Sequence, residues 1–88
     1  MYLISDNIDT LTGMRLAGVE GVIVHEHDEL KEALERTIAD KEIGIILLTE
    51  KFGREFPEII DDVKNLRSEI GIIYLSNYNK SVLQKIIR

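Results

Sequence analysis

The chain has no cysteine and no tryptophan, and only one of its 88 residues is proline. The lack of cysteine excludes disulfide bonds, thiolate nucleophiles and thiolate-based zinc sites within this chain. No apolar run approaches the ~20 residues that a membrane-spanning helix needs, and no basic stretch precedes an apolar run as in a signal peptide. With 44% hydrophobic and 31% charged residues, the composition predicts one small cytoplasmic domain.

The charge of the chain is acidic overall but uneven along its length. The formal net charge is −5, which argues against general nucleic-acid binding, because nucleic-acid-binding domains carry a basic face. Residues 25–42 hold seven acids and three bases, whereas residues 77–88 hold three bases and no acid. Two interpretations of this basic end stay open. Its cations suit the C-terminus of a helix, or they meet an acidic partner.

The chain repeats one pattern, an apolar strand-like run followed by a helix-like segment. This pattern predicts strands at 2–5, 19–24, 43–48 and 70–75, helices at 8–17, 28–40, 57–67 and 77–88, and a short helical turn at 50–55. Gly18 is expected to end the first helix, because glycine is favoured just past helix C-termini. Thr49 is expected to cap the short turn. Leu66 is expected on the apolar face of the helix that begins at Pro57.

Strands that are joined by helices pair in parallel through right-handed crossovers. The run 43–48 has no alternating polar residue, so we expect a central strand that is buried on both faces. The run 70–75 has the same pattern, and an edge strand is expected among 2–5 and 19–24. We therefore predict an α/β fold, a small flavodoxin-like or Rossmann-like parallel four-stranded sheet in the order 2-1-3-4 with helices on both faces. We expect residues 1–88 to form one domain. Its C-terminal helix, 77–88, either packs on its own sheet, which we favour because no long linker follows Leu75, or serves as an interaction segment. Inside the runs 43–48 and 70–75, Gly44 and Gly71 predict a close approach of neighbouring backbone.

Ligands of such sheets bind outside the carboxyl ends of the strands. The side chains expected there are those of Ser5, Asp6, Asn7, His25, Thr49, Glu50, Ser76 and Asn77. They hold little recognisable chemistry. Gly13 and Gly18 have the spacing of P-loop glycines, but Val19 and Glu20 follow where that motif has lysine and a hydroxyl residue. We therefore expect no catalytic residue and no nucleotide cofactor.

His25 and His27 would place two imidazoles on one face of an extended segment. A metal site needs about three protein ligands in a defined geometry, and the chain has no third histidine. We favour a solvated connection between a strand and a helix, and we expect no bound metal.

Asp6, at the end of the first predicted strand, is similar to a carboxylate of phosphorylated receiver domains. Those domains need an acidic cluster for Mg²⁺ and an aspartate at the end of the third strand. Thr49 stands at that place here, and no fifth strand supplies their lysine. We prefer a turn or cap for Asp6. A free-standing receiver-like regulatory domain without a phosphoacceptor is kept as the alternative function.

The segment DNIDTLTGMRLAG, residues 6–18, resembles the N-terminal motif of the F subunit of V-type (archaeal or vacuolar) ATP synthases. That family typically has D-x-x-T-x-x-G-F-R-L-x-G after a first apolar strand. The matching residues here are Asp6 or Asp9, Thr10, Gly13, Arg15, Leu16 and Gly18, and Met14 replaces the usual phenylalanine. The run 43–50 is similar to the third strand of the family, so that the resemblance covers about residues 2–75.

The resemblance implies a non-catalytic subunit of the rotary central stalk, without a nucleotide site of its own. Such a subunit binds the coiled-coil shaft, reaches the catalytic head through its C-terminal segment, and helps to couple ATP turnover to proton or sodium transport. It implies a cytoplasmic protein, peripheral to the membrane. The residues expected to bind the partner are Arg15, Tyr78, Lys80, Lys85 and Arg88. The chain departs from the family after residue 75, where members usually have a proline-bearing loop and a separate helix.

Overall fold

The computed structural model describes residues 1–76, and the fold within them is a four-stranded parallel sheet between two helical layers. The elements in chain order are β1 (Tyr2–Ser5), α1 (Ile8–Leu16), β2 (Glu20–Ile23), α2 (His27–Ala39), β3 (Ile45–Thr49), α3 (Glu50–Glu55), α4 (Pro57–Leu66) and β4 (Gly71–Leu75). The strand order is β2-β1-β3-β4, with every pair parallel. The predicted fold class and strand order are therefore confirmed, whereas the helix predicted at 77–88 lies outside the described residues.

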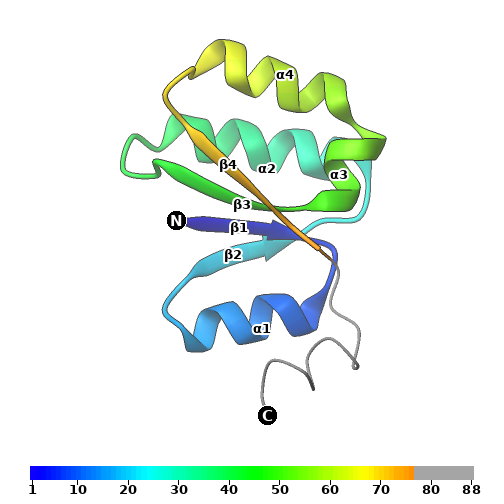
Figure 1. Cartoon of the computed structure of the whole chain (residues 1–88), viewed down its shortest axis with the longest axis vertical. Coiled ribbons are helices and arrows are strands. Elements are labelled where there is room, and N and C mark those ends of the chain that lie inside the picture. Colours follow the sequence, from blue (N-terminus) through cyan, green and yellow to red (C-terminus); the bar gives the residue numbers. More distant parts are fainter. Residues whose placement is uncertain (77–88) are drawn as a thin grey trace.

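The helices cover the two faces of the sheet unequally. Figure 1 shows α1 on one side of the sheet and α2 and α4 on the other, with α3 at the strand ends. The larger core lies under α2 and α4, where Ile4, Ile46 and Leu48 are fully buried. The smaller core lies under α1 and consists of Leu3, Leu11 and Leu47. Within residues 1–76 no helix covers the outer part of β4 on the α1 side, where the Ile73 side chain is 48% exposed.

The ends of the helices follow from local sequence. The Asn7 side chain accepts hydrogen bonds from the Asp9 and Thr10 amides and so caps α1. Gly18 follows α1 with φ +86°, a backbone conformation that glycine adopts without steric cost. Glu26 and Glu29 form a reciprocal capping box at the start of α2. Pro57 occupies the first turn of α4, as predicted.

Several details of the prediction were wrong. The run 70–75 is not a buried central strand, because β4 lies at the edge of the sheet and exposes Ile73 and Tyr74. Leu66 points out of the core and is 70% exposed. Gly44 lies before β3, in open space, and Gly71 has only ordinary contacts, so neither marks a close approach.

Thr49 does not cap α3, contrary to prediction. Its side chain makes no capping hydrogen bond, because its Oγ1 atom donates to Ser5 Oγ over 2.9 Å across the centre of the sheet. Ser5 Oγ also accepts a hydrogen bond from the Asn7 amide at 3.1 Å. Both hydroxyl side chains are buried, so this short chain of hydrogen bonds joins the ends of β1 and β3 to the start of α1.

The close approach of backbone occurs at Gly21, in β2, where α1 packs over the sheet. A Cβ atom at Gly21 would lie 2.6 Å from the Leu3 carbonyl oxygen, which no rotamer change can relieve. We expect Gly21→Ala to destabilise the domain by about 1–3 kcal/mol, as overpacking does. Gly13→Ala is the matched control, because its Cβ meets no atom within 4 Å. Alanine in the middle of α1 should stabilise by about 0.5–1 kcal/mol. Urea unfolding followed by circular dichroism measures both, and equal effects would contradict the close approach.

The Thr49–Ser5 hydrogen bond gives a second prediction. Thr49→Val keeps the shape of the side chain but removes the donor to Ser5, so we expect a loss of about 1 kcal/mol in the free energy of unfolding. Thr12→Val is the control, since Thr12 Oγ1 donates to the Ile8 carbonyl on the exposed side of α1 and its loss should change stability by no more than ~0.5 kcal/mol. If both variants lowered the melting temperature by the same amount, the buried hydrogen bond would contribute no more to stability than the exposed one.

Candidate functional site

The carboxyl ends of the strands bring together most of the polar residues that the sequence placed there. Beyond the Ser5–Thr49 pair, the Ser76 hydroxyl lies 3.4 Å from Glu50 Oε2, and Asp6 Oδ2 lies 3.6 Å from Lys51 Nζ. Asn7 is occupied in capping α1. Asn77 lies outside the described residues. The cluster is therefore held largely by contacts among its own members.

Asp6 is the one carboxylate of this cluster that is largely shielded from solvent. Its side chain is 17% exposed, and its Oδ1 atom is buried without a hydrogen-bond partner among residues 1–76. Lys51, its ion-pair partner, was missed by the sequence analysis. No short-range signal links the two, because the pair forms only once β1 and β3 lie side by side. In the described part of the chain no three histidine or acidic side chains come together as metal ligands.

The two histidines do not act together in the described structure. His25 is exposed, and its backbone amide donates to Glu29 Oε1. The His27 ring lies against Asp28, with Nδ1 and Oδ1 3.2 Å apart, and its edge packs on the Phe56 ring at a centroid distance of 5.4 Å. His27 thus links the start of α2 to the start of α4.

The 6–18 motif divides into residues that build the fold and residues that face outward. Thr10 and Leu11 are the residues of α1 that are buried against the sheet. Gly18 supplies the positive φ that ends the helix. Arg15 and Leu16 are exposed, Leu16 to 88%, and packing explains neither. Of the residues expected to bind a partner, the structure therefore places Arg15 on an open surface. The others, Tyr78, Lys80, Lys85 and Arg88, lie outside the described residues.

None of the helices in the part that the structure describes is both long and apolar enough to cross a membrane. The surface of the described residues consists of exposed helix faces and the open edge of the sheet. Its exposed apolar side chains include Ile8, Leu16, Leu66 and Ile73.

Comparison with known proteins gives one consistent family. The chain is 46% identical over 55 residues to the A-type ATP synthase F subunit of Methanothermobacter thermautotrophicus, covering 61% of this chain and 51% of that protein. It is 35% identical over 63 residues to the F subunit of Methanococcus maripaludis strain C7, covering 70% and 64%. It is 27% identical over 71 residues to that of Methanococcoides burtonii, covering 81% and 72%. The matched region is thus about half to two thirds of the first two relatives.

The family model described as "ATP synthase (F/14-kDa) subunit" matches residues 1–86, nearly the whole chain. The motif at residues 6–18, the parallel sheet and the relatives point to the same assignment. The chain therefore belongs to the family of ATP synthase F subunits, as the resemblance in its opening segment predicted.

Proposed function

We propose that this chain is a non-catalytic subunit of the central stalk of a V/A-type ATP synthase, which binds the coiled-coil shaft. The match of the family model over residues 1–86 carries the proposal. In this role the subunit helps to couple ATP turnover to proton or sodium transport from the cytoplasmic side of the membrane. Its end after Ser76 meets the shaft and contacts the catalytic head.

The geometry of the strand ends supports a role without an active site. Ligands of doubly wound sheets bind where neighbouring crossovers leave in opposite directions, which here is the gap between β1 and β3. The two hydroxyl side chains at that gap, Ser5 and Thr49, are buried and bonded to each other. Thr49 also stands where a receiver domain would need its phosphoacceptor carboxylate, so no observation favours the alternative regulatory function.

We place the shaft contact on the basic residues of the chain end together with the α1 surface. Residues 77–88 carry three bases and no acid, and Arg15 is exposed in the last turn of α1. Coiled coils carry charged residues, often glutamate and lysine, beside their apolar seam, and the glutamates among them would pair with these bases. Opposite charges across such an interface raise the association rate.

The experiment is co-expression of the chain with the coiled-coil shaft subunit of a V/A-type ATP synthase from the same organism, followed by measurement of association kinetics. We expect a stable complex. Lys80→Glu combined with Lys85→Glu should slow association about tenfold or more at low salt, with the effect fading as salt is raised, because screening weakens exposed charge pairs. Folding should be nearly unchanged, because lysine side chains are almost never fully buried and surface charge pairs contribute little to stability.

Lys41→Glu with Lys64→Glu is the matched control, because both side chains are exposed and the net charge changes equally. This control should associate much closer to the rate of the unmodified chain. Failure to form any complex with the stalk protein would overturn the proposed function. If the Lys80 and Lys85 changes left the association rate unchanged, the contact would instead lie at Arg15 and the 6–18 motif.

A further inference from the structure

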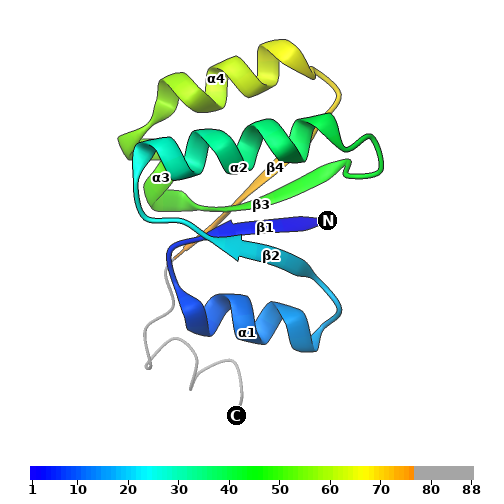
Figure 2. The ribbon, with the colours of Figure 1, turned by 180° about the vertical axis from the view of Figure 1, so that it is seen from behind.

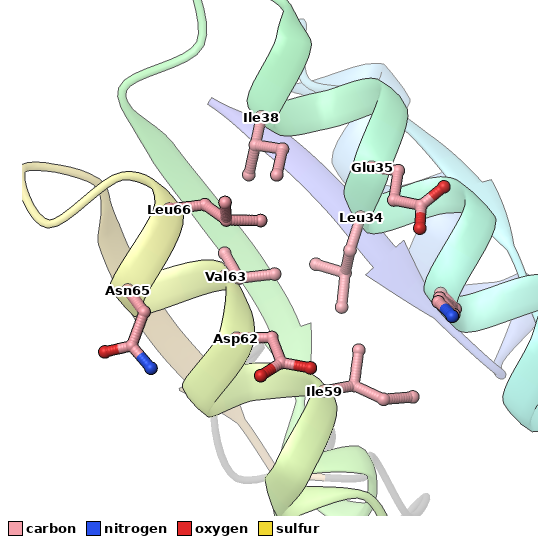
Figure 3. Close-up of a pocket in the computed structure, with 9 residues that line it drawn as sticks. Leu34, Glu35, Ile38, Ile59, Asp62, Val63, Asn65 and Leu66 are labelled. Atoms are coloured by element: carbon pink, nitrogen blue, oxygen red, sulfur yellow. The ribbon is translucent and has the colours of Figure 1, made fainter.

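The outer helical layer contains an apolar groove between α2 and α4, on the face of the sheet opposite to α1. Figure 3 shows the apolar side chains of the two helices turned toward one another across this groove. It encloses about 300 Å³, and its apolar lining consists of Leu34, Ile38, Ile59, Val63 and Leu66. Leu34, Ile59 and Val63 belong to the buried core, whereas Leu66 is 70% exposed. Core residues therefore form the floor of the groove, and the solvent-exposed Leu66 forms one of its walls.

The groove is held open at a fixed width by contacts at both of its ends. At one end, the His27 ring packs edge-on against Phe56. At the other end, the Arg67 guanidinium donates hydrogen bonds to the carbonyls of Ile38, at 3.4 Å, and Asp40, at 3.2 Å. Figure 2 shows α2 and α4 lying side by side between these ends. A surface that is already ordered loses less conformational freedom on binding, which favours association.

The charge around the groove is strongly acidic. Helix α2 carries four acids and two bases, and α4 carries three acids and one base, for a net charge of −4. At the rim itself, the carboxylates of Glu35 and Asp62 and the ammonium group of Lys31 are exposed. None of these three forms an ion pair with another residue in the described range 1–76. The rim therefore has a net negative charge that internal pairing does not neutralise.

We infer that this groove is a second docking surface of the protein, for a basic amphipathic helix of a neighbouring protein. Such a helix would place one apolar stripe against Ile38 and Leu66, above the buried floor residue Leu34, and lysine or arginine side chains beside Glu35 and Asp62. The lining residues of α2 run from Lys31 to Ile38, a rise of about 10 Å, which matches two turns of the incoming helix. Apolar anchors at helical spacing, flanked by cations, are the features that such a groove selects.

The groove lies on a different face of the sheet from Arg15, the one described residue of the shaft contact proposed above. Arg15 lies on α1, and α1 and the α2–α4 layer cover opposite faces of the sheet (Figure 1). The two faces also differ in charge, because α1 carries one acid and one base, whereas the two helices of the groove have a net charge of −4. A neighbour bound at Arg15 and a neighbour bound in the groove would therefore lie on opposite faces of the sheet.

The test uses the full chain, uniformly labelled with ¹⁵N, and two designed 14-residue amphipathic helices that share one leucine stripe. One probe has lysine at its polar positions and the other has glutamate. We expect the lysine probe to bind and to shift the amide resonances of α2 and α4, while those of α1 stay in place. Leu66→Ser should weaken this binding about tenfold, because a leucine contact is lost. Glu35→Gln with Asp62→Asn should weaken it about threefold at low salt and not at high salt.

The controls use exposed positions outside α2 and α4, on α1 and on the edge strand β2. Leu16→Ser removes an exposed leucine, and Asp9→Asn with Glu20→Gln removes two exposed carboxylates. Neither control should change binding of the lysine probe. The inference is overturned if the glutamate probe binds as well as the lysine probe, if the shifted amides lie in α1, or if Leu16→Ser weakens binding as much as Leu66→Ser. Because these probes contain no stalk protein, the result is independent of the proposed function.

Discussion

The rest of the structure depends on the pairing of β1 with β3 at the centre of the sheet. Leu3, Ile4 and Ser5 of β1 are essentially inaccessible to solvent, and Ile46 and Leu48 of β3 are equally buried. Both faces of a parallel pair of this kind must be covered by other elements. The helices that pack on the sheet are therefore positioned by these two strands. The hydroxyl pair of Ser5 and Thr49 joins the strands where the crossovers diverge, which satisfies two polar side chains in the interior.

The direction of the crossovers from this pair separates the chain into two surfaces of different character. The connection from β1 to β2 carries α1 across one face, and the later connections carry α2 and α4 across the other (Figure 1). The helical layer on the second face has a net charge of −4, whereas α1 on the first face carries one acid, Asp9, and one base, Arg15. Faces that differ in charge in this way can discriminate between neighbouring proteins.

Within the 6–18 motif, the requirements of folding and of function can be told apart. Thr10, Leu11 and Gly18 are explained by burial and by backbone conformation. Gly13, Arg15 and Leu16 face outward, and a Cβ atom at Gly13 would meet nothing within 4 Å. The fold does not require these outward residues, so they are the part of the motif that is open to a partner. The sequence alone shows the motif, but it does not show which half serves which purpose.

The sequence by itself determined the type and order of the elements, the parallel sheet, its strand order and the family. These follow from periodicity, from glycine, proline and capping residues near their own helices, and from a motif within one short segment. Only the tertiary structure decided that Thr49 bonds to Ser5 rather than capping α3, that Lys51 pairs with Asp6, and that β4 and Leu66 are exposed. Each of these depends on residues that are distant in sequence. An apolar run looks the same whether a neighbouring strand or helix covers it, so its burial is fixed only when the layers assemble.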